Sequence, residues 1–135
     1  MIEVTHLVKY YGDKKAVNDI SFKVEDGELV GFLGPNGAGK TTAMNVITGY
    51  LSATAGTAKI NGIDILEDPI EAKKHIGYLP EQPPLYMDMS VNEYLDFICD
   101  LKGVNTKRKK HIEEVCELAG ITDVYDKIIA EVERP

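Results

Sequence analysis

The sequence predicts an α/β fold in which a strand, a glycine-rich loop and a helix follow one another. The run Leu29-Val30-Gly31-Phe32-Leu33 lacks outward polar alternation, as expected of a strand covered on both faces of a mostly parallel sheet. Six residues rich in glycine, 34–39, follow this run directly. From Lys40 onward apolar residues recur at helical spacing, and Gly49 can end that helix. The central strand therefore leads straight into the loop.

The length and charge of the chain limit what it can bind. A chain of 135 residues with 44% hydrophobic and 27% charged residues fits one ordinary folded domain. Its net charge of −7 argues against broad binding to nucleic acid, so an anionic ligand must be held locally. Cys99 and Cys116 are expected to be reduced thiols. With neither a signal peptide nor an apolar run of about 18 residues, we expect a cytoplasmic chain whose partner supplies any membrane span.

Short antiparallel strands are predicted on either side of this central unit. The alternation of Ile2, Val4, His6 and Val8 predicts a first strand, and strand character resumes over 17–24 after the Gly12-Asp13 break. Asn61-Gly62 lies between two short alternating arms, which predicts a hairpin because both turn residues tolerate positive φ. A second buried strand is predicted over Ile76-Gly77-Tyr78-Leu79, where Pro80 stops it.

The remaining elements are predicted helices. Pro69 can open a short helix that ends at Lys74. Ser90 and Glu93 form a capping box before a helical pattern that stops at Gly103. A last helix is predicted from Thr106 to Ala119, with Gly120 at its end. The chain thus divides near Gln82 into a strand-rich part and a helical part.

Residues 34–41 match the phosphate-binding pattern G-x-x-x-x-G-K-[ST]. Its glycines let backbone N–H groups converge on phosphate oxygens, and the following helix adds positive charge at its N-terminus. Lys40 supplies a charge for the β- and γ-phosphates, Thr41 can ligate Mg²⁺, and Thr42 can add a hydrogen bond. The glycine spacing disfavours a Rossmann loop. The predicted phosphate-binding residues are Gly34, Pro35, Asn36, Gly37, Ala38, Gly39, Lys40, Thr41 and Thr42.

Further matches to one family surround this motif, over residues 4–12, 16–22, 27–42, 56–57, 60–62 and 76–82. With them, nearly the whole chain resembles the ATP-binding subunits of ABC transporters, a P-loop NTPase family. In that family an aromatic residue at the position of Tyr11 stacks on adenine, with Tyr10 the weaker candidate, and a Q-loop glutamine at the position of Gln82 reaches Mg²⁺ and the attacking water. The resemblance thus implies ATP and Mg²⁺ as ligands, Thr41 and Gln82 as metal ligands, and Lys40 and Gln82 as catalytic residues. Within the family, Pro84-Leu85-Tyr86 and residues 90–95 resemble the exporter and gliding-motility branch.

The resemblance also implies a division into an ATP-binding core with an antiparallel β subdomain, 1–82, and a partial helical subdomain, 83–135. The family's signature segment Ser-x-Gly-x-x-Gln should follow Ile129, but residues 130–135 contain no Ser, Gly or Gln. Walker B, the D-loop and the switch histidine are missing as well. We therefore expect the family's N-terminal half, which binds Mg²⁺-ATP without efficient hydrolysis and leaves an edge of the central sheet open.

Two kinds of partner follow from the resemblance. ABC transporters pair with a transmembrane permease and form head-to-tail dimers with a second nucleotide-binding subunit, at the cytoplasmic face of the membrane. Residues 83–89 are where the permease would dock. The alternatives are a soluble ABC-type ATPase, such as a translation or assembly factor, and a chain that only binds nucleotide. The basic run 107–110 is expected to be a solvated face rather than a lipid contact.

Overall fold

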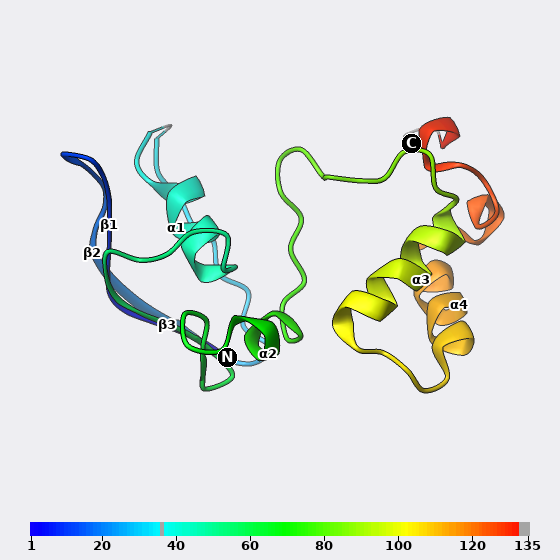
Figure 1. Ribbon diagram of the computed structural model, residues 1–135, viewed down its shortest axis with the longest axis horizontal. Coiled ribbons are helices and arrows are strands. Elements are labelled where there is room, and N and C mark those ends of the chain that lie inside the picture. The colour runs from blue at the N-terminus through cyan, green and yellow to red at the C-terminus, as the bar shows by residue number, and fades with distance from the viewer. Residues whose placement is uncertain (36, 133–135) are drawn as a thin grey trace. The chain divides into compact units, whose positions relative to one another are not determined.

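The computed structural model describes residues 1–35 and 37–132 and confirms a mixed α/β fold (Figure 1). The chain divides into two compact units, Met1–Tyr78 and Leu79–Pro135. The first unit holds a sheet and two helices, and the second unit is helical. Each unit has its own hydrophobic cluster among the described residues.

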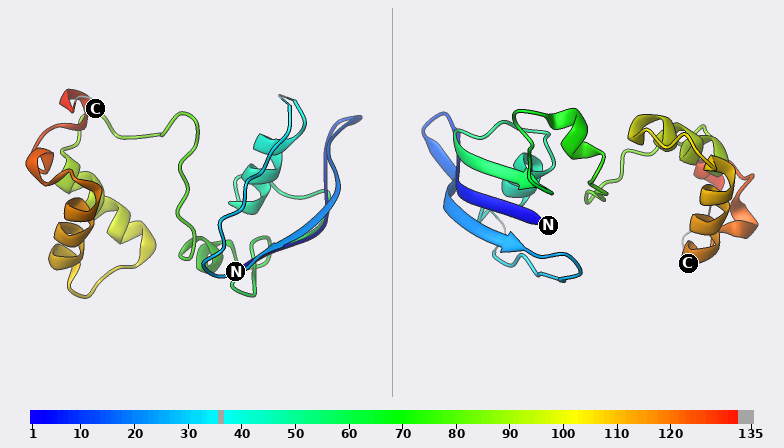
Figure 2. Two further views of the ribbon diagram at one scale, coloured as in Figure 1. Left: turned by 180° about the vertical axis from the view of Figure 1, so that it is seen from behind. Right: turned by 90° about the horizontal axis from the view of Figure 1, so that it is seen from below.

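The sheet of the first unit is antiparallel. Its strands are β1 (Ile2–Tyr11), β2 (Lys14–Val24), β3 (Ala55–Ile60) and β4 (Ile63–Asp64), in the spatial order β2-β1-β3-β4 (Figure 2). The predicted hairpin at Asn61-Gly62 is confirmed, since these residues have φ angles of 50° and 80° and join β3 to β4. The predicted break at Gly12-Asp13 is confirmed as the turn between β1 and β2.

Two helices accompany this sheet. Helix α1 (Lys40–Ile47) begins and ends as the sequence predicts, and it buries Ala43, Val46 and Ile47. These side chains join a cluster with residues of β1, β2 and β3, which places α1 against the sheet. Helix α2 (Pro69–Lys73) starts at the predicted proline, and Asp68 caps it by accepting a hydrogen bond from the Glu71 N–H at 3.3 Å. Because α1 packs on the sheet, its first turn, which follows the glycine loop directly, is held in place against the sheet.

A β-bulge interrupts the first strand, so the simple alternation predicted for β1 is wrong after Val4. The pairing with β2 shifts register between Val4 and Leu7, both of which are fully buried, whereas His6 between them is exposed with a φ of 49°. Gly56 of β3 makes the bulge possible, because a Cβ there would lie 2.2 Å from the His6 carbonyl oxygen. His6 Nδ1 lies 2.7 Å from Asp19 Oδ1, which links the bulge to β2.

The two predicted buried strands do not form. Leu29–Leu33 has no regular secondary structure, and the side chains of Leu29 and Leu33 are 99% and 94% exposed. Ile76–Leu79 has none either, and Leu79 is 79% exposed. The cause is strand pairing: a strand of a parallel sheet needs neighbouring strands on its edges, and within the described residues neither run pairs with a strand of the sheet. Ring contacts still tie Phe32 to Phe22 of β2, with centroids 5.7 Å apart.

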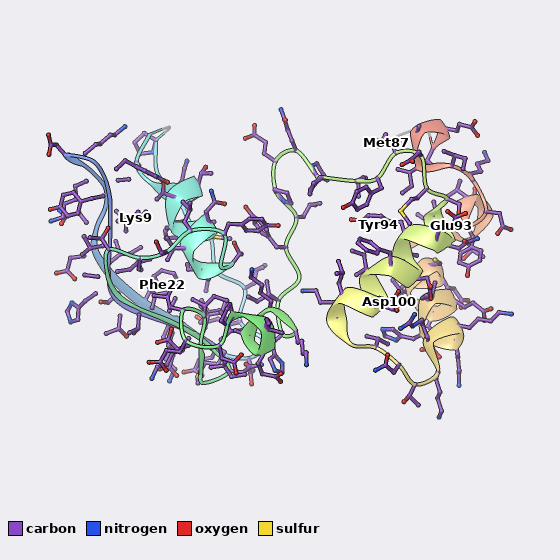
Figure 3. The ribbon with its side chains drawn as sticks, viewed as in Figure 1. Lys9, Phe22, Met87, Glu93, Tyr94 and Asp100 are labelled. Carbon is purple, nitrogen blue, oxygen red and sulfur yellow. The ribbon has the colours of Figure 1, made fainter. Side chains whose placement is uncertain are left out.

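The second unit consists of two packed helices and two short 3₁₀ turns. Helices α3 (Val91–Lys102) and α4 (Arg108–Ala119) enclose Cys99, Ile112 and Cys116, and the turns span Thr122–Val124 and Ile129–Glu131. Both cysteines are free thiols, and burial raises the pKa of Cys116. Figure 3 labels Tyr94 and Asp100 on α3.

One arginine ties α4 to α3. Arg108 at the start of α4 lies 3.1 Å from Asp96 and 2.8 Å from Asp100, both on α3. Its hydrogen bonds to these carboxylates raise the pKa of the guanidinium. The helix begins at Arg108 rather than at the predicted Thr106, because Lys107 has a left-handed backbone with a φ of 54°. The predicted ends at Gly103 and Gly120 are confirmed.

The capping serine of α3 allows a direct test of this fold. Ser90 is buried, and its Oγ accepts a hydrogen bond from the Glu93 N–H at 3.3 Å. We expect Ser90→Ala to lower the free energy of unfolding by about 1 kcal/mol, because an N-terminal donor of the helix loses its partner. Urea titration followed by circular dichroism measures this, with Thr106→Ala, at an exposed position before α4, as the control. Equal stability of the two variants would contradict the role of the cap.

Candidate functional site

The glycine-rich loop joins residues 28–33 to the first turn of α1. Gly39 is the N-cap of α1, with a left-handed φ of 94°, and the Ala38 N–H donates to the Pro35 carbonyl at 3.1 Å. The loop thus turns tightly and delivers the chain into the helix. Asn36 of the predicted motif lies outside the described residues.

The loop packs directly on β2 at one point. A Cβ on Gly39 would lie 2.1 Å from the carbonyl oxygen of Ala16, and it would also contact the side chain of Val17. No L side chain fits there, and the φ of Gly39 is one that L residues rarely adopt. A glycine at this position is therefore required both by backbone geometry and by the close approach of β2.

The N-terminus of α1 is suited to an anion. Its N-cap residue, Gly39, has no side chain that could cap it, its first turn contains no acidic residue, and it begins with Lys40, Thr41 and Thr42. Free backbone N–H groups and the helix dipole both favour negative charge at such a terminus. The Lys40 ammonium donates to the carbonyl oxygen of Gly34 and so connects the two ends of the loop.

A pocket of about 190 Å³ lies between the loop and the turn that joins β1 to β2. One wall is the predicted phosphate loop and the start of α1, and the other is the end of the β1–β2 hairpin. Tyr11 on that hairpin is half exposed, and the Lys9 ammonium lies 5.8 Å from the centroid of its ring. The pocket is lined by Tyr11, Lys14, Ala16, Gly37, Gly39, Lys40, Thr41 and Thr42.

Sequence reasoning did not single out Lys14 and Ala16 as part of the site. Lys14 is the cross-strand partner of Tyr11, and that register becomes visible only once the Gly12-Asp13 turn is known to join two paired strands. Ala16 contributes a backbone carbonyl, for which a sequence motif carries no signal. The sequence did contain one signal, the Gly12-Asp13 turn, because a two-residue turn between paired strands places the residues on its two sides opposite each other.

Gln82 is not among the described residues that line this pocket. Gln82 is exposed in a segment without helix or strand and belongs to the second unit. Tyr10 is not among the residues that line the pocket, and its ring lies 5.5 Å from the Lys15 ammonium. In the basic run at the start of α4, Arg108 is engaged by Asp96 and Asp100, while Lys107, Lys109 and Lys110 are exposed.

This fold and loop define the P-loop NTPase class. A protein-family model described as "ABC transporter" matches residues 17–133, so the chain belongs to the ABC transporter ATP-binding family. The chain is similar to an uncharacterized ABC transporter ATP-binding protein, YxlF of Bacillus subtilis, with 38% identity over 130 residues that cover 96% of this chain and 42% of the relative. It therefore spans less than half of that relative's length.

Other relatives and solved structures agree with this assignment. The chain is 34% identical to a probable multidrug ABC transporter ATP-binding protein, YbhF of Escherichia coli, over 92% of this chain and 22% of that protein. A solved ATP-binding subunit of an ABC transporter superposes with a TM-score of 0.88 at 26% identity, covering 98% of this chain and 55% of the other. A putative ABC transporter ATP-binding protein from Pyrococcus furiosus superposes with a TM-score of 0.77 at 33% identity, covering 98% of this chain and 62% of that protein.

The contact between Gly39 and Ala16 predicts how the loop responds to substitution. Gly37 and Gly39 have similar φ angles of 86° and 94°, but a Cβ on Gly37 would contact nothing within 4 Å. Both alanine variants should lose about 1 kcal/mol of stability to the strained backbone, and Gly39→Ala should lose a further 1–3 kcal/mol, roughly, to the collision with Ala16. Guanidinium titration followed by circular dichroism measures the difference. Equal losses in both variants would show that the loop does not pack on β2.

Proposed function

We propose that the chain is the Mg²⁺-ATP-binding part of an ABC transporter ATP-binding subunit. The observation that carries the proposal is the pocket that combines the aromatic ring of Tyr11 with the phosphate loop and Lys40. A flat ring beside a loop that offers cationic and N–H donors matches a molecule with a planar base at one end and phosphates at the other. ATP has this arrangement.

The aromatic ring, the loop amides, the lysine and the threonine of the pocket each have a distinct part in binding. The Tyr11 ring stacks on adenine, and the loop amides with the α1 terminus hold the phosphate oxygens. The Lys40 ammonium leaves the Gly34 carbonyl and turns to the β- and γ-phosphates, which offer it full negative charge. The Thr41 hydroxyl lines the same pocket and suits Mg²⁺, an ion that binds through a few protein oxygens together with substrate phosphates.

Hydrolysis by this chain alone is expected to be slow. Phosphoryl transfer needs a positioned water and groups that neutralise the developing charge. Gln82 would serve the water and Mg²⁺, but the motifs that complete this chemistry in the family are missing from residues 1–135. We therefore propose binding with negligible turnover, and a turnover number in the ordinary enzyme range that Lys40→Ala abolishes would contradict it.

Transport is proposed to depend on a permease and a second nucleotide-binding subunit at the cytoplasmic face of the membrane. Within the described part of the chain, no helix is long and apolar enough to cross a membrane. The side chains of Leu85, Tyr86 and Met87 are 40–53% exposed and form an apolar segment in the second unit where a partner can dock. We favour a membrane partner over a soluble ATPase because residues 83–89 hold the position where the permease docks in the transporters that this chain resembles, and an exposed apolar segment suits a protein interface.

Calorimetric titration of Mg²⁺-ATP into the purified chain tests the binding proposal. The unsubstituted chain should give saturable heat, and Lys40→Ala should weaken binding by at least about tenfold, because it removes the charge that pairs with the terminal phosphates. Lys59→Ala, at an exposed position of β3 outside the pocket lining, is the matched control and should bind as the unsubstituted chain does. Binding of Mg²⁺-ATP by Lys40→Ala with the same affinity as the unsubstituted chain would place the nucleotide elsewhere.

A further inference from the structure

A second lysine, Lys14, lines the pocket from the hairpin side. It is the first residue of β2 and pairs with Tyr11 across the Gly12-Asp13 turn. Directly paired residues of an antiparallel pair point to the same face of the sheet. Tyr11 and Lys14 accordingly both line the 190 Å³ pocket. The residue that sits beside the proposed adenine platform is therefore a cation.

The next cross-strand pair belongs to the other face. Tyr10 pairs with Lys15, and the Lys15 ammonium lies 5.5 Å from the centroid of the Tyr10 ring. Neither residue lines the pocket. Successive residues of a strand point to opposite faces, so the register sends Lys14 toward the loop and Lys15 away from it. Lys15 therefore lies on the same strand as Lys14 and carries the same charge, but it points to the opposite face of the sheet.

The charges around the pocket leave Lys14 available for an anion. Among the described residues, the lining holds two ammonium groups, those of Lys14 and Lys40, and no aspartate or glutamate. Within the described residues, no ion pair engages Lys14. In a chain of net charge −7, two cations without an acidic neighbour in one pocket mark a local site for negative charge.

We propose that Lys14 is a nucleotide-binding residue that contacts the phosphate nearest the nucleoside. The inference rests on the proposed function, because it takes the nucleotide to lie with its base on Tyr11 and its terminal phosphates at Lys40. Lys14 is the partner of Tyr11, so its ammonium meets the phosphate chain at the base end, whereas Lys40 meets it at the far end. Lys14 then serves ATP and ADP alike.

Competition with a fluorescent nucleotide analogue, on the full chain, tests this inference. Lys14→Ala should weaken the binding of Mg²⁺-ATP and Mg²⁺-ADP by a similar factor of about three to ten, the size expected for one exposed, charge-assisted contact. Lys14→Arg should keep most of the affinity, and Lys15→Ala should match the unsubstituted chain. Because the contact is exposed, the loss in Lys14→Ala should shrink as salt rises from about 0.05 to about 0.5 M.

The outcomes separate this inference from the proposed function. If the unsubstituted chain binds Mg²⁺-ATP and Lys40→Ala does not, while Lys14→Ala binds within twofold of the unsubstituted chain, the role of Lys14 is overturned and the proposed function stands. Equal losses in Lys14→Ala and Lys15→Ala, or a loss that salt does not change, also overturn it. An unsubstituted chain that binds no Mg²⁺-ATP overturns both proposals.

Discussion

The close approach of Gly39 to the Ala16 carbonyl is the constraint on which the proposed site depends. It joins two segments that are distant in sequence, the start of β2 and the N-cap of α1, with no room for a side chain between them. The β1–β2 hairpin is held by its pairing with β3, and α1 is held by its packing on the sheet. The pocket therefore has two walls that are each fixed by the core, while the glycine contact sets their separation.

Local signals in the sequence predicted those features that depend on few residues. Asn61-Gly62, the Ser90 cap and the glycines that end α3 and α4 all act within one turn of the chain, so their chemistry is readable from their neighbours. The phosphate-binding motif is of the same kind. What the motif could not reveal was that Lys14 and Ala16 line the pocket opposite the loop, because Lys14 enters through strand pairing and Ala16 through its backbone carbonyl.

The larger failures were predictions that depended on distant partners. The bulge at His6 exists because Gly56 on another strand permits it, and alternation along β1 carries no trace of that glycine. Leu29–Leu33 has the composition of a buried strand, yet an apolar run becomes a strand only when a neighbour accepts its hydrogen bonds. The composition of such a run therefore indicates that its side chains can be buried, but whether it forms a strand depends on the neighbouring strands of the sheet.

The separation of the chain into two units has a consequence for its cooperativity. The buried clusters of the two units share no described residue, one being formed around β1, β3 and α1 and the other around Cys99, Ile112 and Cys116. Cooperative unfolding arises from a shared core, so each unit can open with its own free energy, and hydrogen exchange can distinguish the two. A ligand held by the first unit would then protect the amides of that unit and leave those of α3 and α4 to exchange at their own rate.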